Sequence, residues 1–255
     1  MEEKKSYIKV TAYFLLINLI VRVPGVVRNT MPWISDELGV WMTASWFGGY
    51  ADSWKAYIND SGSVMGYYGF IASLVYAPII CLLKNIKIVY TLCILVNAIL
   101  IAIMGVIAFS ILHKYLKTDI KTAVIISTLS SMNYTTLHHA NTIMTETVFT
   151  LWVWIVFLLV VKSLYSSNLY KPKVINTILF AVIIAAGYGI HSRCLVVWGM
   201  LLIIYLIYLA LKKKQLVNLF VFAPVFVFTY VCLSSVSNAI QGSFWNTSGV
   251  TNSTE

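Results

Sequence analysis

Long apolar runs separated by short polar connectors dominate this chain. A segment needs roughly 20 mainly apolar residues to cross the hydrocarbon core of a bilayer. Only two stretches are both long and polar, residues 28–64 and residues 237–255. The runs that approach spanning length are 8–27, 65–83, 86–112, 122–140, 144–163, 174–190, 194–211 and 215–236. The pattern predicts an all-α fold, a polytopic transmembrane bundle of about seven or eight hydrophobic helices within residues 1–236, followed by a polar tail.

The composition agrees with a membrane location. Hydrophobic residues make up 60% of the chain and charged residues 11%, and the mean hydropathy is +0.83. A soluble domain of 255 residues needs more surface charge than this, so membrane lipid is the expected surrounding. The net charge of +9 fits cytoplasmic loops rich in lysine rather than a nucleic-acid partner. The four cysteines lie in or beside apolar runs without metal-like spacing, and we interpret them as small hydrophobic residues.

Lysine clusters predict the orientation of the chain. Lys4, Lys5 and Lys9 place the N-terminus inside, so that the first helix is retained and residues 28–64 form an external loop. Three further inside loops are marked by lysines within residues 114–121, 162–173 and 212–214. Between these anchors the external side receives residues 138–146, 191–193 and the tail. The plasma membrane of a bacterium is the expected location.

One pair of segments disturbs this alternation. Residues 65–83 and 86–112 both lie between the external loop and the inside loop at 114–121, and two crossings would put that loop outside. We therefore expect one segment not to cross. Residues 65–83 are favoured as an interfacial or re-entrant helix, because they contain Gly66, Gly69, Ser73 and Pro78.

The first external loop carries an adjacent acidic pair, Asp36 and Glu37, among aromatic residues. The aromatic residues are Trp33, Trp41, Trp46, Phe47, Tyr50, Trp54 and Tyr57. Their spacing predicts an amphipathic helix at the headgroup level, where indole and phenol rings prefer to lie. Carboxylates held there would meet both lipid and water, although the pair is also compatible with a solvated turn.

Glu146 is the one acidic residue with apolar segments close on both sides. A carboxylate near a membrane helix usually has a function or a partner. The alternative is local: Thr142 or Thr145 caps a helix that begins near 145, and Glu146 faces the positive end of its dipole. The two roles are compatible with each other.

Basic and imidazole side chains form the second group of candidates. Arg193 lies between two apolar runs, and its guanidinium suits a phosphate, although a snorkelling interface residue has the same pattern. His191 is two residues away and could assist. His138 and His139 are candidate substrate contacts near Glu146, and neighbours on a helix point in different directions, which disfavours a shared metal.

The order of these segments along the chain resembles that in the membrane-embedded GT-C superfamily of glycosyltransferases, in the branch of protein O-mannosyltransferases and aminoarabinose transferases. "SDELGVWMTASWFGGY" resembles the Asp/Glu motif that opens the first external loop, and "YYGFIASLVYAPI" resembles the segment that ends it. "NYTTLHHANTIMTETVFTLWVWIVFLLV" resembles the later segment with a second acidic residue, and "AAGYGIHSRCLVVW" the Gly-rich turn with a basic residue. The family normally continues with more helices, so we expect a fragment or a short member.

The resemblance implies a mechanism. Asp36 or Glu37 would be the general base that deprotonates an acceptor hydroxyl, which then displaces a polyprenyl phosphate from the anomeric carbon with inversion. Glu146 would position the acceptor or hold a divalent cation. Arg193, with Arg28 or Lys55, would neutralise the leaving phosphate. The expected partner is a polyprenyl-phosphate-linked sugar donor, and no nucleotide is required.

Two other classes of function remain open. A transporter or flippase for a lipid-linked or anionic substrate would use Glu146, Arg193 and the histidines as a relay near the bilayer midplane. Such proteins often contain inverted repeats, and this sequence shows no such symmetry. A non-catalytic membrane partner of a larger complex is the third class.

Overall fold

The protein is helical throughout the part that the structure describes. The computed structural model describes residues 2–28, 35–49, 69–139, 141–165, 174–212 and 218–245. These ranges contain ten α-helices, one π-helical turn and no strand. The prediction of an all-α fold is confirmed for them.

Five of the described helices are long and apolar enough to cross a membrane. They are α1 (Glu2–Arg28), α5 (Ile86–Ser110, continued by the π-helical turn η1, Ile111–Tyr115), α8 (Thr145–Tyr165), α10 (Cys194–Lys212) and α11 (Leu219–Trp245). Five others are shorter: α2 (Ser35–Phe47), α4 (Phe70–Leu82), α6 (Ile120–Ser131), α7 (Tyr134–His139) and α9 (Val174–Ile190). A multi-pass membrane protein is compatible with this set, but fewer helices have spanning length than the seven or eight expected.

The expected span at 122–140 is broken in two. α6 ends at Ser131 and α7 begins at Tyr134. Asn133 lies in the break, where its Nδ2 donates to Ser130 O at 3.0 Å and its Oδ1 accepts from Thr136 N at 3.0 Å. A side chain that closes one helix and caps the next stops the apolar run from forming one helix.

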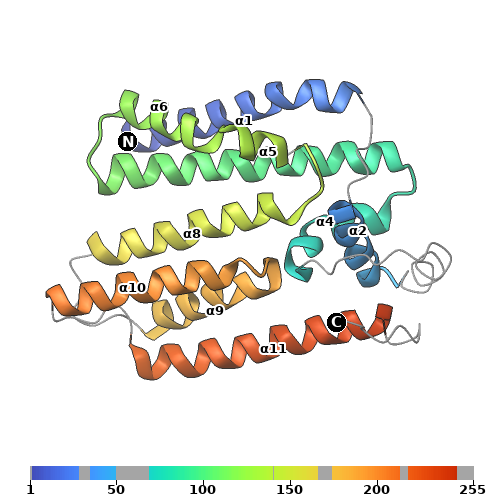
Figure 1. Ribbon diagram of the computed structural model, residues 1–255. Coiled ribbons are helices and arrows are strands. Elements are labelled where there is room, and N and C mark those ends of the chain that lie inside the picture. The colour runs from blue at the N-terminus through green and yellow to red at the C-terminus, as the bar shows by residue number, and fades with distance from the viewer. Residues whose placement is uncertain are drawn as a thin grey trace.

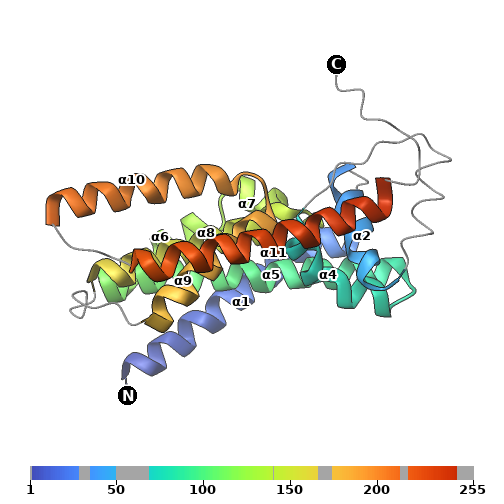
Figure 2. The same ribbon diagram turned by 90° about the horizontal axis from the view of Figure 1, so that it is seen from below.

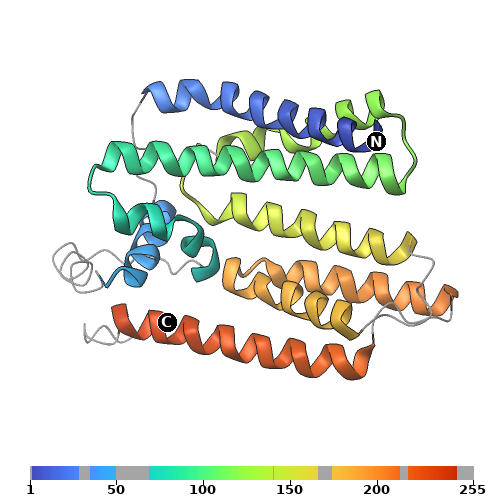
Figure 3. The same cartoon turned by 180° about the vertical axis from the view of Figure 1, so that it is seen from behind.

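The two ends of the bundle differ in chemistry (Figures 1 and 3). One end holds α2, α4, the last turns of α1 and α11, the first turns of α5 and α8, and the turn between α9 and α10. The other end holds the N-terminus, the α5–α6 connection with Lys114, Lys117 and Lys121, and the end of α8 with Lys162. Within the described residues, the segments 138–139, 141–146 and 191–193 lie at the same end of the bundle as α2, which is compatible with the prediction that they share a side with the first loop. Which side of a membrane this is stays a prediction.

α4 fits the expectation that residues 65–83 do not cross. Its 13 residues span about 20 Å, whereas the hydrocarbon core is about 30 Å thick. It lies beside α2, at the end of the bundle where α5 begins (Figure 1). This placement leaves Lys84 and Lys87 at the same end, as the prediction required.

α2 is more deeply packed than the expected amphipathic helix. Val40, Met42 and Ala44 are fully buried on it, and Glu37 and Thr43 are buried as well. The tryptophans of its described part, Trp41 and Trp46, are partly buried against neighbouring helices. A surface helix with one wet face is therefore not confirmed. Trp33, Tyr50, Trp54 and Tyr57 lie outside the described residues.

α5 is the central element of the bundle and packs antiparallel against α1 (Figures 1 and 2). Gly105 of α5 lies under the ring of Phe14, which is fully buried. Tyr7 and Phe109 meet edge to face, with ring centroids 5.4 Å apart. The missing side chain at 105 lets the two helices approach closely enough for this packing. α10 and α11 expose most of their apolar surface, as expected for helices that face lipid.

Substituting Gly105 tests the α1–α5 contact. A Cβ at this position would overlap the Phe14 ring, whereas a Cβ at Gly199 of α10 meets no atom. We expect Gly105→Ala to lower the free energy of unfolding by about 1–3 kcal/mol through overpacking. Gly199→Ala should leave it unchanged or raise it, because alanine favours helix. Thermal unfolding in detergent measures both, and equal midpoints would contradict the packing.

Candidate functional site

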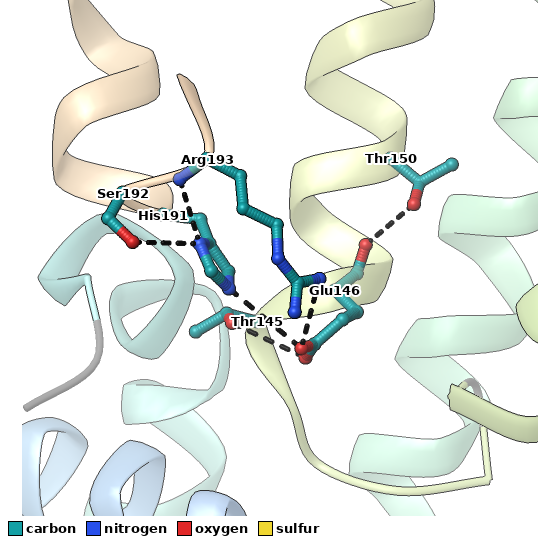
Figure 4. A network of polar contacts seen from close by, with 6 residues as sticks. All are labelled: Thr145, Glu146, Thr150, His191, Ser192 and Arg193. Atoms are coloured by element: carbon teal, nitrogen blue, oxygen red, sulfur yellow. Dashed lines mark hydrogen bonds and ion pairs between the residues drawn. The ribbon is translucent and has the colours of Figure 1, made fainter. Parts of the chain in front are cut away.

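Three charged or titratable side chains from distant parts of the chain meet at the end of the bundle that holds α2 (Figure 4). Glu146 lies in the first turn of α8, and His191 and Arg193 lie in the turn between α9 and α10. Glu146 Oε1 is 3.9 Å from His191 Nε2 and 3.8 Å from Arg193 Nη1. Both separations exceed hydrogen-bond length, so the carboxylate is flanked by the two groups without being closed off by either.

Close helix packing brings this turn to Glu146. Gly187 of α9 lies against the ring of Trp152 on α8, and Gly189 lies against Ile71 on α4. Side chains at either glycine would push α9 away from its neighbours. Trp152 also donates from Nε1 to Ile183 O at 2.6 Å, which fixes α8 and α9 relative to each other.

Backbone hydrogen bonding fixes the tautomer of His191. Its Nδ1 accepts from the backbone N–H of Arg193 at 3.1 Å. A ring nitrogen that accepts carries no proton, so the proton of the neutral imidazole is on Nε2, the atom that faces Glu146. The ring also packs on Phe149, with centroids 5.4 Å apart. His191 is therefore a donor that points at the carboxylate.

Exposure separates the members of this cluster. Glu146 and His191 are each 12% exposed, whereas Arg193 is 64% exposed. The guanidinium is therefore reachable from outside while the carboxylate lies beneath it. An anion could contact Arg193, and a hydroxyl or cation could reach Glu146. Thr142 does not cap α8, because its Oγ1 donates to His139 O at 2.8 Å.

Glu37 lies in the interior and holds α2 in place. It is 3% exposed, and its Oε1 accepts from Ile143 N at 2.7 Å and from the Tyr90 hydroxyl at 3.0 Å. Ile143 is three residues before Glu146. The carboxylate thus fastens α2 to the segment that leads into α8, a structural role that its sequence context did not reveal.

More side chains hold the same segment. Asn97 of α5 donates to Thr142 O at 2.8 Å and accepts from the Tyr76 hydroxyl of α4 at 2.6 Å. The Tyr90 hydroxyl also lies 3.1 Å from Asn141 O. The contacts to Thr142 O and Asn141 O give non-helical backbone groups partners inside an apolar bundle, and the Tyr76 hydroxyl orients the Asn97 amide.

Arg22 of α1 is a residue that the sequence analysis missed. It is fully buried, and its Nη1 donates to Leu137 O at 2.8 Å and to Asn141 Oδ1 at 3.1 Å. The sequence did contain a signal for it. A single arginine inside the apolar run 8–27 is costly in a membrane and marks a functional or structural site.

Other predicted site residues lie elsewhere or cannot be placed. Lys55 lies outside the described residues, and for Arg28 and Asp36 only the backbone is described. His138 is exposed and His139 half-buried, with their rings 5.4 Å apart. Within the described ranges, no group of three or more His, Cys, Asp or Glu side chains could hold a metal ion.

An apolar cavity of about 240 Å³ lies between α8, α9, α10 and α11. Its lining includes Phe180, Phe222, Phe226 and, from α10, Trp198 and Tyr205. α10 begins directly after Arg193, so one helix leads from the charged cluster to the cavity.

Comparisons with known proteins identify no relative. No family model, no curated protein and no solved structure matches this chain.

Removing the Glu37 carboxylate tests its structural role. Glu37→Ala leaves the Ile143 N–H and the Tyr90 hydroxyl without this partner. We expect a loss of unfolding free energy of about 1–3 kcal/mol for each donor that is left unsatisfied. Tyr90→Phe, which keeps the bond to Ile143, should lose less. Equal thermal midpoints for Glu37→Ala and the unaltered chain would contradict this role.

Cysteine labelling tests whether Glu146 and Arg193 share one side of the membrane. Single cysteines at 146, 193 and 117 are introduced after Cys81, Cys93, Cys194 and Cys232 are replaced. In sealed vesicles, an impermeant reagent should label 193 quickly and 146 more slowly from the same side, because the two native residues differ in exposure. Position 117 should react only from the other side. Labelling of 146 and 193 from opposite sides would separate the proposed cluster.

Proposed function

We propose that this chain is a membrane-embedded glycosyltransferase similar to the GT-C superfamily, which moves a monosaccharide from a polyprenyl-phosphate-linked donor to a hydroxyl acceptor. The observation that carries the proposal is the meeting of Glu146, His191 and Arg193 at the end of the bundle that holds α2 and α4. An anion-binding group and a partly buried carboxylate at one end of a membrane bundle suit a lipid-phosphate donor and an acceptor that arrives from water.

Arg193 takes the leaving phosphate in this proposal. Its guanidinium is 64% exposed and is 3.8 Å from the Glu146 carboxylate. This separation is longer than a hydrogen bond, so it does not use up the five N–H donors of the guanidinium. A phosphate oxygen could therefore still be bound. The Nε2 proton of His191 supplies a second donor nearby. Together they stabilise the negative charge that develops as the bond from the anomeric carbon to the phosphate oxygen breaks.

We assign the general base to Asp36. Glu37 engages its carboxylate with Tyr90 and Ile143, which makes it the positioning residue of the acidic pair. In the reaction, the acceptor hydroxyl gives its proton to Asp36, and the oxygen forms the new bond to the anomeric carbon. The electron pair of the broken bond leaves with the polyprenyl phosphate, and the configuration inverts. Glu146 positions the acceptor or holds a divalent cation.

The cavity along α10 supports a lipid-linked donor. Trp198, Leu201, Leu202 and Tyr205 line it on the helix that starts after Arg193. With the phosphate at Arg193, a polyprenyl chain would run down this helix into an apolar space. A bacterial plasma membrane, with the Glu146 end facing outward, agrees with the lysine clusters at the other end.

The assay follows polyprenyl phosphate release from a lipid-linked sugar by the full chain in proteoliposomes. We expect Asp36→Asn to lower turnover about 100- to 10,000-fold, the usual contribution of a positioned base. Arg193→Met should be slower than Arg193→Lys, because lysine keeps the charge and loses the bidentate geometry. Lys162→Met, at the opposite end of the bundle, is the matched control and should keep full activity.

Three outcomes would overturn parts of this proposal. Loss of turnover in a stably folded Glu37→Gln variant, with Asp36→Asn unaffected, would move the base to Glu37. Movement of a lipid-linked sugar across the bilayer without its cleavage would favour a transporter. If the chain neither cleaves nor moves any donor, a non-catalytic membrane partner becomes the favoured function.

A further inference from the structure

Arg22 has an unusual set of contacts for a fully buried arginine. Both of its hydrogen bonds, to Leu137 O and to Asn141 Oδ1, come from one nitrogen, Nη1. Nε and Nη2 are buried and have no hydrogen-bond partner within the described part of the chain. The ion pairs found among the described residues involve Glu146, and neither includes Arg22.

The two nitrogens without partners form one recognition edge. In a guanidinium, Nη1 lies on the side of Cδ, so Nε–H and one N–H of Nη2 point the same way. This pair is the fork that holds a carboxylate or phosphate through two parallel hydrogen bonds. A charged group in an apolar interior without a counter-ion is strongly destabilising, whereas an oxyanion on the fork supplies both the charge and the two acceptors.

We infer that the Nε–Nη2 fork of Arg22 is a binding site for a phosphate group. Phosphate is the oxyanion that a membrane environment offers, either as a lipid headgroup or as the free ion. Exclusion of water at a fully buried side chain strengthens such charge-assisted hydrogen bonds. Nη1 stays on Leu137 and Asn141 and orients the fork.

This site is separate from the Arg193 cluster. Arg22 lies on α1, whereas Arg193 precedes α10, and these helices lie on opposite sides of α8 (Figures 1 and 2). The inference therefore does not depend on the proposed sugar transfer. It does connect with the segment that positions Glu146, because Asn141 contacts both Arg22 and Tyr90.

Thermal unfolding of the full chain in detergent, titrated with inorganic phosphate, tests the site. Chloride at equal ionic strength is the reference. A ligand that binds only the folded state raises the midpoint further as its concentration rises above its dissociation constant. We expect phosphate to raise the midpoint of the unaltered chain. Arg22→Lys keeps the charge without the fork and should need about tenfold more phosphate for the same shift. Arg22→Met should lose most of the shift, and Lys162→Met, at the opposite end of the bundle, should respond as the unaltered chain does. A shift in Arg22→Met as large as that of the unaltered chain would overturn the inference.

A second arm identifies the source of the phosphate. The same proteins are reconstituted in phosphatidylcholine vesicles with and without phosphatidic acid, and their unfolding is compared. A shift with phosphatidic acid but not with inorganic phosphate assigns the site to a lipid headgroup, and a shift with inorganic phosphate assigns it to the free ion. A structural role alone would lower the midpoint of Arg22→Lys equally with and without phosphate. That result, or no response of the unaltered chain to either probe, would overturn the inference.

Discussion

Backbone that leaves the helical conformation inside an apolar bundle must find partners for its polar groups, and this requirement organises the structure. The segment between α7 and α8 is such a stretch. Arg22, Glu37, Tyr90 and Asn97 reach it from α1, α2 and α5, and each one bonds a backbone or amide group within residues 137–143. Without these contacts, unsatisfied groups would be left in an apolar surrounding, at a cost of several kcal/mol each in a bilayer core.

The candidate site inherits its geometry from this segment. Glu146 follows directly after it, so the contacts that fix residues 137–143 also fix the first turn of α8. The turn with His191 and Arg193 is brought in by a different means, the close packing of α9 at Gly187 and Gly189. Polar contacts thus place the acid, and shape complementarity between helices places its basic neighbours. The exposed guanidinium of Arg193 therefore lies over a carboxylate that buried contacts hold in place.

One residue of the acidic pair in the first loop has a structural role. Glu37 is buried and bonded, and it ties α2 to the start of α8. Asp36 is the residue left for chemistry in the proposed transfer reaction. An adjacent pair of carboxylates therefore need not be two catalytic groups. In an apolar protein, one of them can be a buried anchor between helices, as Glu37 is.

The sequence by itself determined the helical class, the membrane character and the set of segments that share one end, because apolar run length and lysine placement act locally along the chain. It also named Glu146, His191 and Arg193 as candidates. Only the tertiary structure decided that these three meet, that Glu37 is buried and that Arg22 is enclosed. It also divided residues 122–140 at Asn133. Such outcomes depend on which distant backbone groups need partners and on how closely helices approach each other. The hydropathy pattern along a chain carries no information about either.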